Sequence, residues 1–432
     1  MGKPVIKIAI LGLGTVGTGV CRILSKNAVA IQHKVGARVE IARVLVRDVT
    51  KARNIEIPDQ LLTDDFDAIL GDESIDIIVE LMGGTGIARD YVTRALSQGK
   101  SIVTANKDLI AEFGRELYEL AEKHGGDLLF EGSVGGGIPI IRPLKQCLAA
   151  NAIEEVMGII NGTTNYMLTK MTLEGSDFAE VLAEAQAKGY AEADPTADVE
   201  GLDAARKLAI LACIAFNTRL TFKDVYVEGI TKITKEDIAY AKELNCVIKL
   251  LAVAKQANGA VEVRVHPTMV PVSHPLASVN DVFNAIFVKG DAVGEAMFYG
   301  RGAGELPTAS AVAGDIMDAA RNILHQNRGR ITCTCYDQKP IKPMGDTVTK
   351  YYVRLLVLDK PGVLANIASV FGNQEVSLNS VIQKRNLGEK AELVFVTHQV
   401  LERNIQDALA IIGGMSTVES ISNVIRVIDN EE

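Results

Sequence analysis

Short apolar runs alternate with amphipathic segments through the first third of the chain. The runs predict strands over Val5–Leu13, Val39–Val46, Ile75–Leu81, Ser101–Thr104 and Leu128–Glu131, with helices such as Tyr91–Gln98 and Gly114–His124 between them. Strands that alternate with helices in this way are typical of a parallel, doubly wound α/β sheet. A ligand of such a sheet lies beyond the carboxyl ends of its strands.

The middle of the chain has a mixed pattern. It predicts a strand at Ile153–Ile160, helices over Phe178–Lys188 and from Pro307 to about His325, a hairpin of Val247–Ala254 and Val261–Val265, and strands at Ala285–Val288 and Ala296–Tyr299. Asn258-Gly259 between the hairpin strands is a strong turn signal. The polar run Asn161–Tyr166 predicts only a loop. We therefore expect an α+β domain here.

The last part of the chain follows a stretch of linker composition. Its pattern is strand (Tyr351–Leu358), helix (Val363–Phe371), strand (Leu378–Lys384), strand (Ala391–Thr397), helix (Ile405–Ile412) and strand (Ile421–Val427). This order predicts a ferredoxin-like split βαβ module. The expected division is a dinucleotide-binding domain over 1–140, a substrate and dimerisation domain over 141–330, a linker over 331–349 and a regulatory domain over 350–432.

Composition and charge narrow the class of protein. The 432 residues are 48% hydrophobic and 23% charged, which is ordinary for a globular protein of two or three domains. A net charge of −9 argues against a nucleic-acid partner. No apolar run approaches the ~20 residues needed to span a bilayer. We interpret the six cysteines as reduced thiols, which predicts a cytoplasmic protein without a membrane partner.

A glycine-rich motif follows the first predicted strand and opens a helix. The motif residues, all expected to touch the cofactor, are Gly12, Leu13, Gly14, Thr15, Val16 and Gly17. In this context the pattern indicates a Rossmann dinucleotide site, where the glycines allow backbone to approach a pyrophosphate. Arg47 at the tip of the second strand favours NADP, whereas Asp48 beside it keeps NAD open. The plain alternative for Arg47 is a solvated basic loop.

Further motifs stand at strand ends or turns around the expected cofactor. Lys107 follows the strand Ser101–Thr104 and is placed to polarise a carbonyl. Glu131 opens a glycine-rich segment that runs to Pro139, and the turn at Gly304 offers another backbone edge to the cofactor.

Acidic residues crowd the stretch from Gly189 to Lys207. Asp203 and Lys207 are four residues apart, so on a helix they share a face, and the following run Leu208–Phe216 is wholly apolar. Taken alone, Asp203 and Lys207 fit a solvated ion pair. They also fit a cleft in which carboxylates orient an amine and a lysine handles a proton.

The spacing across this stretch resembles the homoserine dehydrogenase family. The matching residues are Ala185, Gly189, Asp194-Pro195, Asp198, Gly201, Asp203 and Lys207, with every spacing kept. The resemblance covers essentially the whole chain, and the last module is similar to an ACT domain. No kinase-length segment precedes the glycine motif, so the single-function form is expected.

The resemblance implies roles for individual residues. Lys207 would be the acid/base that protonates the aldehyde oxygen, and Lys107 would help hold carbonyl and nicotinamide together. Glu192 and Asp203 would bind the substrate ammonium, with Asp198 in the same cluster, and Gly189 would touch the cofactor. The positions where relatives bind a sodium ion, mostly through backbone carbonyls, are Glu131, Val134, Gly136 and Ile138.

The implied reaction interconverts L-homoserine and L-aspartate 4-semialdehyde, in the biosynthesis of threonine, methionine and isoleucine. An amino acid, expected to be threonine, would regulate it through the ACT module. We expect a homodimer or homotetramer. Two alternatives stay open: a dehydrogenase for another small amino or hydroxy acid, and a non-catalytic amino-acid sensor. The presence of both Asp203 and Lys207 argues against the sensor, which needs no proton donor.

Overall fold

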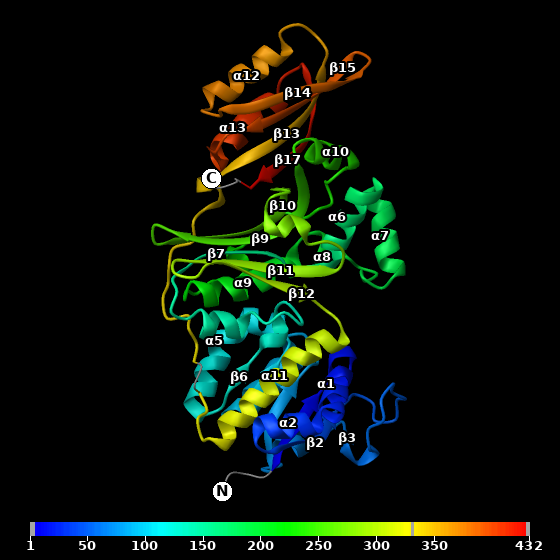
Figure 1. Ribbon diagram of the computed structural model, residues 1–432, viewed down its shortest axis with the longest axis vertical. Coiled ribbons are helices and arrows are strands. Elements are labelled where there is room, and N and C mark those ends of the chain that lie inside the picture. Colours follow the sequence, from blue (N-terminus) through cyan, green and yellow to red (C-terminus); the bar gives the residue numbers. More distant parts are fainter. Residues whose placement is uncertain (1–4, 330–331, 429–432) are drawn as a thin grey trace. The chain divides into compact units, whose positions relative to one another are not determined.

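The computed structural model describes residues 5–329 and 332–428 (Figure 1). The chain forms two compact units. The first comprises Met1–Val156, Arg206–Asp224 and Asn284–Gln338, and the second comprises Met157–Ala205, Val225–Phe283 and Lys339–Glu432. The predicted linker over 331–349 begins outside the described residues.

A six-stranded parallel sheet forms the centre of the first unit. Its order is β3-β2-β1-β4-β5-β6, which is the doubly wound arrangement expected from the sequence. The strands are β1 (Val5–Leu11), β2 (Arg38–Leu45), β3 (Leu62–Thr63), β4 (Ile75–Glu80), β5 (Ser101–Thr104) and β6 (Leu128–Leu129). The strand order reverses between β1 and β4, so the loops that follow these two strands border the ligand crevice.

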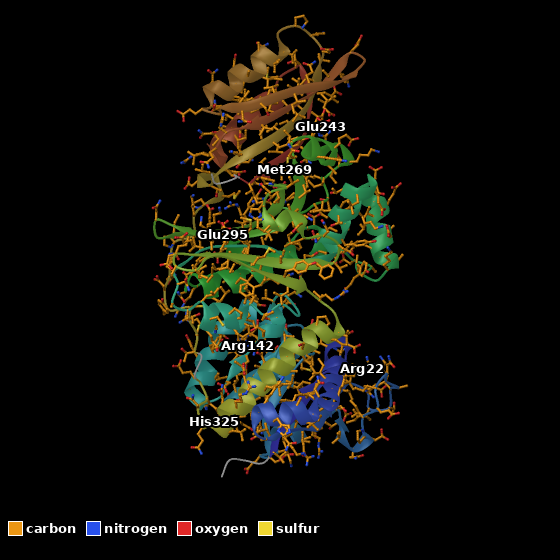
Figure 2. The ribbon with its side chains drawn as sticks, viewed as in Figure 1. Arg22, Arg142, Glu243, Met269, Glu295 and His325 are labelled. Atoms are coloured by element: carbon orange, nitrogen blue, oxygen red, sulfur yellow. The ribbon has the colours of Figure 1, made fainter. Side chains whose placement is uncertain are left out.

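Helices pack on this sheet, and one of them comes from far along the chain. They are α1 (Thr15–Lys26), α2 (Ala28–Val35), α3 (Phe66–Leu70), α4 (Gly86–Ser97), α5 (Lys107–His124) and α11 (Glu305–Leu324). Helices α1 and α11 touch closely, because a Cβ at Gly19 would stand 2.7 Å from the Glu305 carbonyl oxygen. Arg22 (labelled in Figure 2) also pairs with the Glu305 carboxylate at 2.5 Å. The first unit further holds the strands β11 (Phe283–Gly290, from residue 284) and β12 (Gly294–Arg301).

A long antiparallel hairpin forms the centre of the second unit. Strands β9 (Cys246–Ala257) and β10 (Ala260–Pro271) pair along their full length. The turn between them has positive φ at Asn258 (52°) and Gly259 (77°), as a type I′ turn requires. The helices of this unit outside its C-terminal part are α6 (Gly162–Glu174), α7 (Phe178–Ala187), α8 (Thr196–Val199) and α10 (Lys235–Glu243), and β8 (Tyr226–Val227) pairs with β10.

The C-terminal part of the second unit has the predicted ferredoxin-like arrangement. Its elements are β13 (Val348–Leu358), α12 (Val363–Asn373), β14 (Leu378–Leu387), β15 (Lys390–Thr397), β16 (Val400–Leu401), α13 (Glu402–Gly413) and β17 (Val418–Val427). The strands run in the order β17-β13-β15-β14, all antiparallel. The edge of β17 that faces away from β13 pairs in parallel with β10, through Thr268 with Arg426 and Met269 with Val427. One sheet therefore joins this module to the hairpin (Figure 1).

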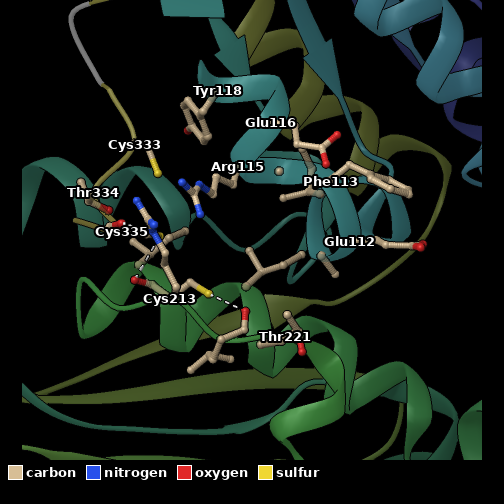
Figure 3. Close-up of a pocket in the computed structure, with 18 of the residues that line it drawn as sticks. Glu112, Phe113, Arg115, Glu116, Tyr118, Cys213, Thr221, Cys333, Thr334 and Cys335 are labelled. Carbon is tan, nitrogen blue, oxygen red and sulfur yellow. Dashed lines mark hydrogen bonds between the residues drawn. The ribbon is translucent and has the colours of Figure 1, made fainter. Parts of the chain in front are cut away.

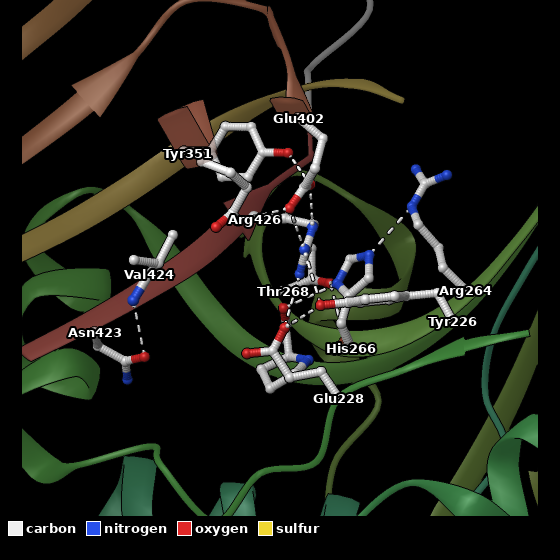
Figure 4. Close-up of polar contacts among 12 residues, drawn as sticks. Tyr226, Glu228, Arg264, His266, Thr268, Tyr351, Glu402, Asn423, Val424 and Arg426 are labelled. Carbon is white, nitrogen blue, oxygen red and sulfur yellow. Dashed lines mark hydrogen bonds and ion pairs between the residues drawn. The ribbon is translucent and has the colours of Figure 1, made fainter. Parts of the chain in front are cut away.

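Buried ions reinforce this junction (Figure 4). Arg426, which is 5% exposed, pairs with Glu402 at 2.7 Å and with Glu228 beside β8 at 2.9 Å. A second pair joins Arg354 of β13 to the fully buried Asp237 of α10 at 2.8 Å. Ion pairs thus tie the C-terminal module to Glu228, which follows β8, and to the buried Asp237 of α10.

Several element bounds differ from the sequence expectation, among them those of α4, β10 and β17, and the differences at α5 and α6 bear on the candidate site. Asn161–Tyr166, predicted as a loop, forms the N-cap and first turn of α6. Helix α5 begins at Lys107, seven residues before the predicted start at Gly114. In both cases a capping asparagine (Asn161, Asn106) starts the helix, and the residues that follow it include Gly, Thr or Asp of low helix propensity.

Candidate active site

The glycine motif lies between β1 and α1. Gly12 has φ of 98°, and a Cβ there would stand 2.9 Å from the Leu81 carbonyl oxygen. A Cβ on Gly17 would collide with the Gly12 carbonyl, so both positions require glycine. Space is open beside Gly14, and no side chain caps the N-terminus of α1. The backbone N–H groups there are available to an anion such as a pyrophosphate, so the motif fits a dinucleotide.

A buried carboxylate fixes the neighbouring loops. Glu80 at the end of β4 is fully buried and accepts from the Met82 N–H at 2.8 Å and the Thr104 hydroxyl at 2.7 Å. Asn106 donates its amide to the Gly84 carbonyl at 2.7 Å and caps α5 through Leu109 N–H. Lys107 is therefore the first residue of a capped helix at the carboxyl edge of the sheet.

The tip of β2 carries Arg47 and Asp48, both exposed. The Asp48 carboxylate accepts from the N–H of Thr50 at 2.8 Å and from its hydroxyl at 2.6 Å. The hydroxyl bond lowers the pKa of Asp48. One oxygen of the Asp48 carboxylate is therefore engaged by its own loop, beside the exposed Arg47.

The segment 131–138, which was predicted to bind a sodium ion, is mostly buried. The carboxylate of Glu131 already accepts several hydrogen bonds. The Glu131 carboxylate accepts from the N–H groups of Ile140 (2.6 Å), Ile141 (2.8 Å) and Arg142 (2.8 Å). The Arg142 guanidinium (Figure 2) also reaches Asp318 at 2.8 Å. Among the described residues, no group of three or more His, Cys, Asp and Glu side chains is placed to hold a metal.

In the second unit one asparagine bridges two of the predicted aspartates. The Asn161 amide donates to Asp198 at 2.7 Å and to Asp203 at 3.0 Å. Its carbonyl oxygen accepts from Thr164 N–H at 2.9 Å and so caps α6. Asn161 was not among the residues predicted from the sequence; the only signal was its place directly after a predicted strand and before the small residues Gly162, Thr163 and Thr164.

The surrounding loop brings α8 next to this cluster. Asp194 accepts from the Thr196 N–H at 3.1 Å and opens α8, which carries the half-buried Asp198. The Val199 carbonyl accepts from Ile230 N–H at 2.8 Å. Asp198 is therefore held from both ends of its short helix.

Three other predicted residues take no part in this hydrogen-bonded bridge. Glu192 is exposed, and the structure describes no contact between its carboxylate and Asp198 or Asp203. Gly189 follows α7 with φ of 74° and open space beside it. The predicted cofactor contact at Gly304 is the N-cap of α11, with φ of 124°.

Asp203 and Lys207 both lie on α9 (Leu202–Ala215), one turn apart and therefore on the same face. Asp203 is buried and Lys207 is half-buried. A carboxylate and an ammonium on one rigid, partly buried helix can bind a zwitterion and move a proton. Among the described residues, no helix is long and apolar enough to cross a membrane.

Known proteins match this chain over nearly its whole length. Three family models match: "Homoserine dehydrogenase, NAD binding domain" over residues 12–131, "Homoserine dehydrogenase" over 139–317 and "ACT domain" over 351–413. The chain is 47% identical to a homoserine dehydrogenase of Corynebacterium glutamicum, with 98% of this chain and 95% of that protein aligned. It is 42% identical to that of Bacillus subtilis, over 98% and 99% of the two chains.

Solved structures give the same result. A homoserine dehydrogenase of Thiobacillus denitrificans matches with a TM-score of 0.93 and 42% identity, over 99% of both chains. That of S. aureus at pH 7.5 matches with a TM-score of 0.79 and 37% identity, over 98% and 99%. A hyperthermophilic archaeal homoserine dehydrogenase in complex with NADPH matches 73% of this chain and 97% of its own, with a TM-score of 0.62 and 25% identity.

Proposed function

Because the chain belongs to the homoserine dehydrogenase family, we propose that it interconverts L-homoserine and L-aspartate 4-semialdehyde and prefers NADP(H). The observation that carries the proposal is the pair Asp198 and Asp203, bridged by Asn161, with Asp203 one helical turn before Lys207 on α9. An amino-acid dehydrogenase needs carboxylates for the ammonium and a proton donor for the alkoxide, and this stretch supplies both.

Each residue has a distinct task in the proposed reaction. Asp203, with Asp198 and Glu192, binds the substrate ammonium. Lys207 gives a proton to the aldehyde oxygen during reduction and takes it back during oxidation, while Lys107 holds the carbonyl in place. The nicotinamide cofactor supplies the hydride when bound, along the glycine motif and near Gly189 and Gly304.

The decisive assay follows NADPH oxidation with aspartate semialdehyde. Lys207→Ala should lose nearly all turnover and keep NADPH affinity, because general acid catalysis contributes about 10²–10⁴-fold. A variant that kept its rate would remove Lys207 from the mechanism. Absence of turnover with aspartate semialdehyde, together with turnover of another small hydroxy acid, would favour the alternative dehydrogenase.

The preference for NADP rests on Arg47. Its charge is exposed at the tip of β2, and the Asp48 carboxylate beside it is bound to Thr50. The archaeal relative solved with NADPH is consistent with this choice. Arg47→Ala should raise KM for NADPH about tenfold and leave KM for NADH unchanged; an equal change in both would contradict the preference.

A sodium ion in the loop 131–138 is also part of the proposal. Within the described residues, the buried carbonyls of Val134, Gly136 and Ile138 accept no hydrogen bond. Buried carbonyls usually have a partner, so three of them fit a monovalent cation held by backbone oxygen. Glu131 would contribute through its carbonyl, since its carboxylate is occupied by the N–H groups of Ile140, Ile141 and Arg142.

We further propose feedback by threonine at the ACT module, in the pathway to threonine, methionine and isoleucine. Gly362, with φ of 89°, opens α12 without a side-chain cap, and Asn379 lies at the start of β14. The four-part division at 140, 330 and 349, a homodimer or homotetramer, and a cytoplasmic location belong to the same proposal. Inhibition by threonine that survives a Gly362→Leu substitution would place the regulatory site elsewhere.

A further inference from the structure

A cavity of about 460 Å³ lies within the first unit, and none of the predicted cofactor or substrate residues lines it (Figure 3). Helix α5 forms one wall, the 209–214 part of α9 forms another, and the segment 333–338 closes a third side. Its apolar lining includes Ile110, Phe113, Phe130, Ile210, Ile214 and Leu220. A cavity of this size with mainly apolar walls is typical of a small-molecule site.

One cation in the cavity wall has no acidic partner. Lys145 Nζ lies 2.5 Å from the Tyr118 hydroxyl and 4.4 Å from the centroid of the Tyr118 ring. Throughout the described part of the chain, no carboxylate comes within ion-pairing distance of this ammonium. Burial therefore lowers the pKa of Lys145 to about 8. An anion in the cavity would supply the missing countercharge.

The other polar groups of the cavity point to the same kind of ligand. The Thr334 hydroxyl is buried and has no hydrogen-bond partner among the described residues, so it is free to donate. Of the lining carboxylates, Glu116 pairs with Arg89 at 2.7 Å and Asp224 accepts from Thr221 N–H at 2.6 Å. Two of the three lining carboxylates are thus engaged, and the third, Glu112, is exposed. Lys145 donates to the neutral Tyr118 hydroxyl and to the Thr332 carbonyl, and neither balances its charge.

We propose that this cavity binds a small organic anion with an aromatic or aliphatic body. The apolar walls take the body, and Lys145 with Thr334 takes the anionic group. Such a ligand would contact α5, which begins at Lys107, and α9, which carries Lys207. The site is separate from the glycine motif and does not depend on which substrate the protein turns over.

Two fluorescent probes test the proposal. 8-Anilinonaphthalene-1-sulfonate carries an anion on an aromatic body, and N-phenyl-1-naphthylamine has the same body without the charge. With NADPH saturating, the sulfonate should bind with about one equivalent per chain and at least about tenfold tighter than the neutral probe. Equal affinity for the two probes would overturn the proposal.

Substitutions identify the cation. Lys145→Met should bring the affinities of the two probes to within about twofold, whereas Lys123→Met, at an exposed position in the last turn of α5, should leave the preference unchanged. Thr334→Val should weaken only the sulfonate. A Lys145→Met protein that still prefers the sulfonate would exclude this site.

A pH titration of the unaltered protein provides a test that does not require a variant to fold. The sulfonate stays ionised, so its affinity should fall about tenfold or more between pH 7 and about pH 9.5 as Lys145 loses its proton, since this pKa is about 8. The neutral probe should bind with the same affinity at both pH values. An affinity ratio that did not change with pH would count against Lys145 as the partner.

Discussion

The amide of Asn161 lies between Asp198 and Asp203 and donates one N–H to each. Two carboxylates so close repel each other, and these bonds hold them apart in a defined orientation. The same residue caps α6, so replacing it with alanine would change two things at once.

Asn161→Ser separates the two roles, because serine is also a good N-cap but is too short to bridge the aspartates. We expect KM for homoserine to rise about tenfold, since bonds to charged groups contribute about 1.5–3 kcal/mol. KM for NADPH should hold, whereas the melting temperature should fall, because the same bonds also stabilise the fold. Steady-state kinetics on this variant and on Asn327→Ser, an exposed control, provide the check. An unchanged KM for homoserine would remove Asn161 from substrate binding.

His266 makes stability depend on pH. It is 2% exposed, and its Nε2 accepts from Arg264 Nε at 3.1 Å, which requires the neutral ring. Burial, with Arg426 and Arg264 nearby, lowers its pKa well below the usual value. The unfolded chain therefore binds this proton more readily, and stability falls as the pH drops below about 6.5.

Urea unfolding at pH 7.5 and pH 5.5 measures this effect. His266 should contribute about 1.4 kcal/mol to the loss of stability between the two, as one pH unit below the unfolded pKa implies. His266→Gln should reduce the loss by that amount, and His325→Gln, at an exposed position, should not. If His266→Gln shows the full loss, another group causes it.

At the scale of elements, the buried ion pair between β17 and α13, beside the pairing of β17 with β10, is the vulnerable point. Arg426→Met would leave Glu402 buried without its cation. Breaking a buried pair in this way costs about 3–5 kcal/mol. Equilibrium unfolding should show that loss, and adding Glu402→Gln should recover part of it. Additive losses in the double variant would mean that the pair is not coupled.

The sequence predicted most of these elements but not all of their ends. Strands and the hairpin around Asn258-Gly259 follow from short-range pattern, and they were confirmed. Helix α6 was missed because its first turn is polar and small, and only tertiary burial makes it helical. Glu80 and Asn161 act by holding other loops, and a single sequence carries no pattern for such contacts.

At the scale of the molecule, a short module behind a linker looks removable, yet β17 is hydrogen-bonded to β10. A chain ending at residue 346 would expose the edge of β10 and leave the buried Asp237 without Arg354. Exposed edges promote aggregation. We expect the shortened chain to aggregate in size-exclusion chromatography, whereas a chain that lacks only residues 429–432 should not. A monodisperse, fully active short form would contradict this.

The shared sheet also constrains how such proteins can be recombined. A chimaera that exchanged the C-terminal modules at the linker would place a foreign β17 against β10. It would also place foreign residues at positions 426 and 354, opposite Glu228 and Asp237. A crossover upstream of β8 would transfer β8, α10, β10 and β17 together, so that both sides of this contact would come from the same protein. Any ligand sensitivity of the C-terminal module should therefore be transplanted together with residues 225–283, or altered by single substitutions, and not by swapping the last eighty residues.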